Sequence, residues 1–164
     1  MGIVRPHLWY HSRALEAAEL YTSLIPNSSI TAVRTAPVDM PGVEKGAPFV
    51  VEFTLDGMPV TGLSAGPSFT LDEAFSFVIE CDTQEEVDRY WDALIADGGE
   101  PSQCGWLKDK FGVSWQVVPR VLDSLVFAEG AAGARATEAM LAMGKLDIAA
   151  IQAAHDGALQ PDRA

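Results

Sequence analysis

The apolar and polar positions along the chain form the same pattern twice, about seventy residues apart. A short apolar stretch over residues 3–10 leads into a helix-like stretch, and a second apolar stretch over residues 75–81 does the same. At this offset Glu16 aligns with Glu86 in the two helix-like stretches. Each copy then continues as strand, tight turn and strand. The pattern therefore predicts two similar modules, each with one helix and a small sheet.

Both predicted helices have recognisable beginnings. Ser12 is the expected N-cap of the first helix, which continues to about Leu24. The second helix begins with the capping-box pair Thr83 and Glu86. Its apolar residues then recur at the spacing of a single helix face: Val87, Tyr90, Trp91, Leu94 and Ile95. Each helix is therefore expected to cover one side of its sheet.

The remaining strands are separated by turn residues. Asp56 and Gly57 form the dipeptide typical of a two-residue hairpin, and residues 109–112 form a similar turn in the second copy. One strand is expected before the first turn, at residues 30–38. The strands that flank the two turns are expected at residues 49–55, 58–64, 101–108 and 113–118. Residues 37–48 and 65–72 are expected to be loops.

The composition changes after Pro119, where short, alanine-rich, helix-prone segments follow one another. They cover residues 121–127, 134–143 and 147–154. We expect a core domain and a helical appendage that covers a sheet edge or joins a dimer contact. The predicted division is a core over residues 1–120, with modules at about 3–66 and 73–119, and a helical C-terminal extension over residues 121–164.

Composition narrows the class of function. A formal net charge of -12 argues against nucleic acid and against anionic membrane surfaces as partners. The N-terminal residues do not form a signal peptide, and no apolar run approaches the length of a membrane helix. Two cysteines do not make a disulfide framework. We therefore expect a cytoplasmic protein with free thiols.

The order strand, helix and three strands, given twice, resembles the vicinal oxygen chelate superfamily, the glyoxalase and bleomycin-resistance fold. Within it the chain resembles the PhnB-like branch, which carries the name 3-demethylubiquinone-9 3-methyltransferase. The resemblance covers roughly the first 120 residues and is carried by Leu8-Trp9-Tyr10, Glu16-Ala17-Ala18 with Tyr21, Pro26-Asn27-Ser28, Phe53 with Leu55-Asp56-Gly57, Gly66-Pro67 and, most specifically, residues 103–119. It implies an α+β fold of two βαβββ modules that form a curved mixed sheet.

The methyltransferase name does not agree with the residues. Methyl transfer from S-adenosylmethionine usually needs a glycine-rich turn between a strand and a helix of a parallel sheet. The chain contains no Gly-x-Gly-x-x-Gly, and its strand-turn-strand pattern does not predict a doubly wound sheet. We expect no such cofactor.

The superfamily implies a divalent metal held by a quartet of His and Glu, one from each of four strands. The internal repeat places these positions at His7, Thr61, Phe77 and Gln116. One imidazole, one hydroxyl, one phenyl ring and one amide do not supply the charge that holds a catalytic dication. We therefore expect no metal.

In place of a metal site, we consider a ligand cavity, and the alternation of side chains along each strand predicts which residues line it. If His7 faces the cavity, Trp9 does too, and Cys104 shares a face with Trp106. His7 is a candidate general base, or a strand histidine bonded to backbone or water. Cys104 has no partner base nearby in sequence to activate it. The predicted ligand-binding set is His7, Trp9, Thr61, Phe77, Cys104, Trp106 and Gln116. Aromatic walls with neutral polar groups suit a small, apolar or aromatic ligand, although the tryptophans can also simply fill the core.

Three functional hypotheses follow. The first is a homodimeric protein that binds a small molecule without a catalytic metal. The second is a divergent metal-dependent lyase, isomerase or dioxygenase-like enzyme that uses His7. The third is an interaction protein that acts through its helical tail.

Overall fold

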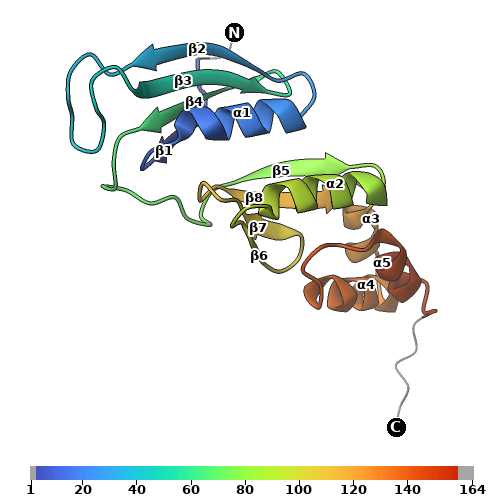
Figure 1. The fold of residues 1–164 in the computed structure, drawn as a ribbon. Coiled ribbons are helices and arrows are strands. Elements are labelled where there is room, and N and C mark those ends of the chain that lie inside the picture. Colours follow the sequence, from blue (N-terminus) through green and yellow to red (C-terminus); the bar gives the residue numbers. More distant parts are fainter. Residues whose placement is uncertain (1–2, 159–164) are drawn as a thin grey trace. The chain divides into compact units, whose positions relative to one another are not determined.

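The structure is a computed structural model, and it describes residues 3–158. The chain divides into two compact units, Met1–Asp72 and Glu73–Ala164. Each unit is a separate body with its own sheet and helix, coloured blue to green and green to red in Figure 1.

The first unit is a four-stranded mixed sheet with one helix. Its elements are β1 (His7–Tyr10), α1 (Ala14–Leu24), β2 (Ser29–Thr35), β3 (Pro48–Leu55) and β4 (Met58–Ser64). The strand order is β1-β4-β3-β2, with β1 parallel to β4 and the other neighbours antiparallel. The helix lies along one face of the sheet (Figure 1). Tyr21 of α1 and Phe53 of β3 are almost fully buried, and their rings are in contact.

The second unit repeats this topology. Its elements are β5 (Ser76–Cys81), α2 (Gln84–Ile95), β6 (Glu100–Pro101), β7 (Trp106–Lys108) and β8 (Ser114–Pro119). The order is β5-β8-β7-β6, with β5 parallel to β8. The predicted duplication and the α+β fold of two βαβββ modules are therefore confirmed. The hydrogen bonds group the strands into two four-stranded mixed sheets.

The start of α1 differs from the prediction. Its N-cap residue is Arg13, which has φ 69°, and no side chain caps the helix locally. Instead, the Ser64 hydroxyl accepts a hydrogen bond from the Ala14 amide at 3.0 Å. Ser12 is therefore not the cap, because a serine distant in sequence satisfies the first helical amide.

The start of α2 agrees with the prediction. The Thr83 hydroxyl accepts a hydrogen bond from the Glu86 amide. The Glu86 carboxylate in turn accepts one from the Asp82 amide at 2.8 Å. The first bond is that of a capping box, and the returning bond from Glu86 reaches the amide of Asp82, one residue before the N-cap Thr83.

The strand predicted over residues 101–108 is interrupted. A turn over Gln103–Trp106 separates β6 from β7, and the Trp106 amide donates to the Gln103 carbonyl at 3.0 Å. Cys104 and Gly105, at the two central positions, have φ 57° and 82°. Positive φ at both positions defines a type I′ turn, which closes a tight hairpin.

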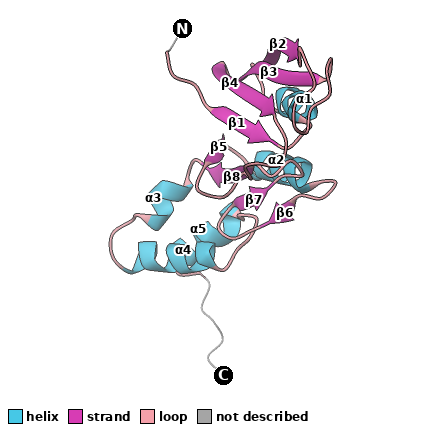
Figure 2. Cartoon of the chain, turned by 90° about the vertical axis from the view of Figure 1, so that its left-hand side faces the viewer, coloured by secondary structure: helices cyan, strands magenta, loops and turns pink. Residues whose placement is uncertain are grey.

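Three helices follow the second sheet: α3 (Leu122–Val126), α4 (Ala131–Leu141) and α5 (Ile148–His155). In Figure 2 α4 and α5 lie side by side below the strands of this unit. Their buried residues form one apolar cluster, which consists of Leu122, Leu125, Ala136, Leu146 and Ile151. The helical extension is confirmed in these positions, and a domain boundary at residue 120 stays a prediction. None of the helices in residues 3–158 has the length and apolar character needed to cross a membrane.

The turn before β8 is built around a buried carboxylate. Asp109 is only 3% exposed. Its Oδ1 accepts hydrogen bonds from the Phe111 and Val113 amides at 2.8 and 3.0 Å, and its Oδ2 accepts one from the Trp115 indole at 2.9 Å. Asp109 therefore joins the turn to the core, whereas Asp56 in the equivalent hairpin is exposed.

This difference gives a matched pair of substitutions. We expect Asp109→Asn to lower the free energy of unfolding by about 2 kcal/mol, because an amide replaces a buried acceptor that serves several N–H groups. Asp56→Asn is expected to change it by less than about 0.5 kcal/mol, because the site is exposed and asparagine tolerates a positive φ. Urea denaturation of both variants measures the difference. Equal effects would show that the buried carboxylate does not stabilise the unit.

Candidate functional site

The register of β1 and β4 decides which side chains of the first sheet face away from its helix. Gly62 lies under α1, since a Cβ atom there would be 3.3 Å from that of Ala14. Leu8 pairs with Gly62, and His7 pairs with Thr61. Because successive side chains alternate, His7 and Thr61 lie on the opposite face. We call the sheet face turned away from the unit's own helix the open face.

The open face of the first unit carries three of the predicted site residues. His7 is exposed, Trp9 is half-buried and Thr61 is 2% exposed. Within the described part of the chain, the Thr61 hydroxyl has no hydrogen-bond partner. The Trp9 indole donates to the Gly66 carbonyl at 2.9 Å, and its ring meets Phe69 edge-on. The expected face-sharing of His7 with Trp9 follows from this register.

The sequence did not point to a charged group on the same face. Glu52 pairs with Thr61 in the β3–β4 ladder. Its Oε1 lies 2.7 Å from Nη1 of Arg34 and 3.6 Å from Nη2 of Arg5. The alternation of β3, in which Val51 and Phe53 are buried, is the signal that could have placed Glu52 there. Its carboxylate is already paired with two cations.

The second unit corrects one position of the expected quartet. Val78, not Phe77, pairs with Gln116 in the β5–β8 ladder, as His7 pairs with Thr61. Phe77 is buried and its ring lies 5.0 Å from that of Trp115. Val78 is 54% exposed on the open face. The offset of seventy residues holds for the helices but is one residue off along β5.

Gln116 is on the open face and already has a hydrogen-bond partner. Its Nε2 donates to the Ser76 hydroxyl at 2.9 Å. Trp106 pairs with Gln116 across the β7–β8 ladder and is half-buried. The structure thus brings Trp106 and Gln116 together, while Phe77 faces the other side of the sheet.

The residues at these positions do not fit the metal that the superfamily implies. The first unit offers an imidazole and a hydroxyl, from His7 and Thr61, and the second offers an alkyl group and an amide, from Val78 and Gln116. A catalytic dication needs several charged or strongly basic ligands. Among residues 3–158, no three His, Cys, Asp or Glu side chains lie close enough to hold a metal ion.

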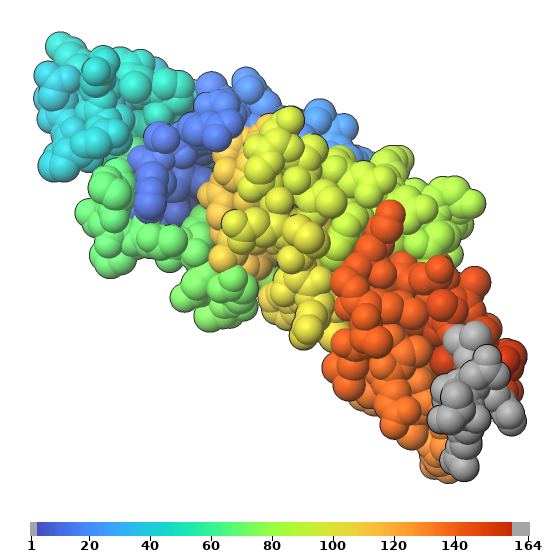
Figure 3. All heavy atoms as spheres, turned by 60° about the horizontal axis from the view of Figure 1, so that its bottom comes forward, coloured from blue at the N-terminus to red at the C-terminus, as the bar shows by residue number. Residues whose placement is uncertain are grey.

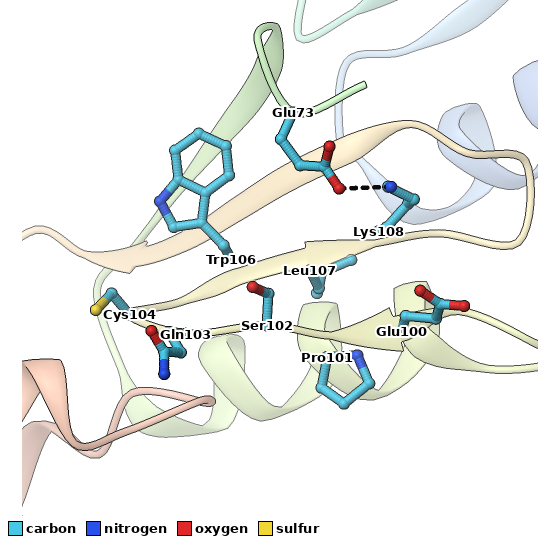
Figure 4. Close-up of a pocket in the computed structure, with 9 residues that line it drawn as sticks. All are labelled: Glu73, Glu100, Pro101, Ser102, Gln103, Cys104, Trp106, Leu107 and Lys108. Atoms are coloured by element: carbon cyan, nitrogen blue, oxygen red, sulfur yellow. Dashed lines mark ion pairs between the residues drawn. The ribbon is translucent and has the colours of Figure 1, made fainter. Parts of the chain in front are cut away.

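A pocket of about 490 Å³ lies in the second unit along β6 and β7. It is lined by Glu73, Glu100, Pro101, Ser102, Gln103, Cys104, Trp106, Leu107 and Lys108. Figure 4 shows Trp106 and Lys108 on the same side of β7 as Glu73, with Leu107 pointing the other way. Two predicted site residues, Cys104 and Trp106, therefore line one pocket, although a turn and not a continuous strand connects them.

An ion pair crosses one end of this pocket. Lys108 Nζ lies 2.5 Å from Glu73 Oε1 (Figure 4). The hydrogen bond from Lys108 holds the pKa of Glu73 below its usual range. The carboxylate therefore stays ionised and paired at neutral pH. The other lining residues provide an indole, aliphatic groups, neutral polar groups and a second carboxylate, that of Glu100.

The two cysteines differ in environment, and both are free thiols. Cys81 is fully buried, and burial raises the pKa of its thiol to about 11, with the nearby Glu86 carboxylate adding to the shift. Cys104 is half-exposed at the edge of the pocket. Only Cys104 is placed to meet a molecule in the pocket.

A second pocket, of about 580 Å³, lies in the first unit between the start of α1 and residues 42–48. Sequence reasoning did not identify it. Its charged residues include Arg13 and Glu16, whose side chains are 2.9 Å apart and paired with each other. It contains none of the predicted site residues.

Comparisons with known proteins agree with this architecture. The family model described as 3-demethylubiquinone-9 3-methyltransferase matches residues 3–118. The structure of a putative 3-demethylubiquinone-9 3-methyltransferase, the PhnB protein from Bacillus cereus, is 30% identical, with a TM-score of 0.65 over 72% of this chain and 99% of that one. Comparison with curated proteins gives no match.

More distant structures share the fold. A protein from Pseudomonas aeruginosa is 18% identical, with a TM-score of 0.59 over 73% of this chain and 98% of that one. The fosfomycin resistance protein FosX from Listeria monocytogenes is 16% identical, with a TM-score of 0.52 over 75% and 94%. The matched model, the Bacillus cereus structure and the duplicated topology together show that this chain belongs to the PhnB-like, 3-demethylubiquinone-9 3-methyltransferase family of the vicinal oxygen chelate superfamily.

Proposed function

We propose that this protein binds a small aromatic or largely apolar molecule, without a catalytic metal, and that the pocket along β6 and β7 holds the ligand. The observation that carries the proposal is the lining of that pocket, where the half-buried Trp106 indole stands between neutral polar groups and the Lys108–Glu73 ion pair. The volume of about 490 Å³ lies within the usual range for small-molecule sites.

The lining also limits the chemistry of the ligand. The Trp106 indole face favours stacking with another aromatic ring. Ser102 and Gln103 offer neutral hydrogen-bonding groups, which fix orientation without requiring a charged ligand. A highly charged ligand such as a nucleotide is disfavoured, because Lys108 is the only cation in the lining and Glu73 already neutralises it.

The family name does not extend the proposal to methyl transfer. Each sheet is a four-stranded mixed sheet with one parallel pair. S-adenosylmethionine usually binds at a glycine-rich turn in a doubly wound parallel sheet, and these two mixed sheets do not have that architecture. We also propose that the protein is cytoplasmic and acts as a homodimer. The other predicted ligand-binding residues on the open faces, His7, Trp9, Thr61 and Gln116, do not line the pocket along β6 and β7, and their role stays a prediction.

Tryptophan fluorescence tests the proposed location. Trp91 and Trp115 are 4% and 1% exposed, so a ligand reaches only the half-buried Trp9 and Trp106. We expect a small aromatic compound, selected from a library by a rise in melting temperature, to quench this fluorescence on titration. Trp106→Phe should abolish the saturable quenching, because the reporting indole is removed, and weaken binding about threefold, because only a smaller ring remains for stacking.

Trp9→Phe is the matched control, since it removes the other half-buried indole and leaves the pocket along β6 and β7 intact. Quenching that survives Trp106→Phe and disappears in Trp9→Phe would move the site to the first unit. A screen in which no aromatic compound raises the melting temperature would contradict the proposal.

A second candidate function is a metal-dependent enzyme that uses His7. It is favoured by one observation: exposed His7 and the Glu52 carboxylate flank Thr61 in adjacent ladders of the first sheet. The ion pairs of Glu52 with Arg5 and Arg34 compete with a metal for the same oxygen.

Elemental analysis of protein purified without chelator distinguishes the two candidates. We expect far less than one Zn, Ni, Mn or Fe ion per chain, because the donor set lacks charged ligands. Wild-type protein and the His7→Ala variant should then give the same low value. A stoichiometric metal ion that His7→Ala removes would establish the second candidate and overturn the first.

A further inference from the structure

The C-terminal extension, residues 121–158 as the structure describes them, lies beyond the residues that the family model matches. The matched family model ends at residue 118, and 72% of this chain accounts for 99% of the Bacillus cereus protein. Figure 3 shows the extension, coloured orange to red, packed against the yellow segment that contains β6 and β7. Its role must therefore be inferred from its own contacts.

The extension contacts the type I′ turn that closes β6 and β7. A left-handed backbone is unfavourable for a residue with a side chain, and Cys104 adopts it with φ 57°. In such a turn the two central amides point outward, away from the hairpin. An isolated turn of this sequence would leave both N–H groups to water.

Two consecutive carbonyls of the extension accept these hydrogen bonds. The Cys104 amide donates to the Met143 carbonyl and the Gly105 amide to the Gly144 carbonyl, both at 2.8 Å. The fully buried Leu146 packs over the same turn, since a Cβ atom at Gly105 would lie 3.0 Å from its Cδ1. Residues 143–146 therefore cover the turn and satisfy its backbone at once.

A side chain at the start of α2 holds this segment in place. The Gln84 carboxamide donates to the Leu146 carbonyl at 3.0 Å and accepts from the Ile148 amide at 2.9 Å. It also donates to Asp88 at 3.1 Å. Lys145 is paired with the same Asp88 at 2.9 Å. The segment is thus fixed to α2 on one side and to the turn on the other.

We propose that the C-terminal extension is a clamp that sets the shape of the pocket along β6 and β7, and that Gln84 is its positioning residue. The clamped turn supplies Gln103, Cys104 and Trp106 to the pocket lining, and Ser102 directly precedes it. Loosening the segment frees the turn and changes how Cys104 and Trp106 are presented.

Thiol labelling with 5,5′-dithiobis(2-nitrobenzoic acid) near pH 8 tests the clamp without any ligand. Native protein should show one reactive thiol per chain, Cys104, because Cys81 is buried and burial raises the pKa of its thiol to about 11. Gln84→Ala removes both hydrogen bonds to the segment. We expect it to raise the labelling rate of Cys104 about tenfold, with Cys81 still silent.

Gln152→Ala is the matched control. Gln152 is also half-buried, and within residues 3–158 its carboxamide bonds Asp156, the C-cap residue of α5, and nothing in the segment that covers the turn. The rate of Cys104 labelling should stay at the wild-type value in this variant. An unreactive Cys81 thiol distinguishes local loosening from global unfolding, because global unfolding would expose both thiols together.

Gly144→Ala provides a second, independent test. A Cβ atom at Gly144 would lie 3.1 Å from the Ser102 carbonyl, so the added methyl group pushes the segment away from the turn. It should also speed Cys104 labelling. Unchanged Cys104 rates in both Gln84→Ala and Gly144→Ala, or parallel rises of Cys104 and Cys81, would overturn the clamp. The labelling experiments use no pocket ligand. They therefore test the clamp even if the proposed ligand binding is found to be wrong.

Discussion

In each unit, the parallel ladder between the first and last strands determines which side chains are available for function. Because Gly62 has no side chain, α1 packs close to the sheet at this position. Leu8, which pairs with Gly62, therefore faces the helix and is buried in the core. His7 and Thr61, one residue away on each strand, must then face the opposite side. A shift of one residue would exchange the buried and open sets completely. The packing of the helix on one face of the sheet thus determines which side chains lie on the opposite, open face.

The chemistry that this constraint leaves on the open faces is mostly neutral or already neutralised. Although the chain carries a net charge of -12, the carboxylate beside Thr61 is paired with Arg5 and Arg34. The amide of Gln116 is bonded to Ser76. A dication would have to displace these partners and gain few strong ligands in return. Recognition through shape, aromatic surface and neutral hydrogen bonds is the use that this arrangement favours.

Most of the fold could be predicted from the sequence because it is locally encoded. The apolar spacing of α2, its cap at Thr83 and the Asp56-Gly57 turn are short-range signals, and each element formed where it was expected. The face assignment of Phe77 failed because an alignment by helices does not fix the register of the strand before them. Pairing of Val78 with Gln116 is a long-range property.

The pocket could be predicted only in part, for a related reason. The sequence predicts Trp106 and Cys104 in one ligand-binding set, as neighbours on one face of a continuous strand, but it does not predict a separate pocket along β6 and β7. The turn between them has a cysteine at a position that usually carries Asn, Asp or Gly, so its only local signal is Gly105. Its amides donate hydrogen bonds to the carbonyls of Met143 and Gly144, and no local sequence pattern predicts these long-range contacts.

These contacts also explain why the extension and the turn form one structural element. Leu146 removes water from Gly105, and a buried amide without an acceptor is costly. The same segment that excludes the water supplies the carbonyls that replace it. Partial release would therefore expose the apolar Leu146 or leave amides unsatisfied, so intermediate arrangements are disfavoured. We therefore expect the segment and the turn to separate together rather than one hydrogen bond at a time.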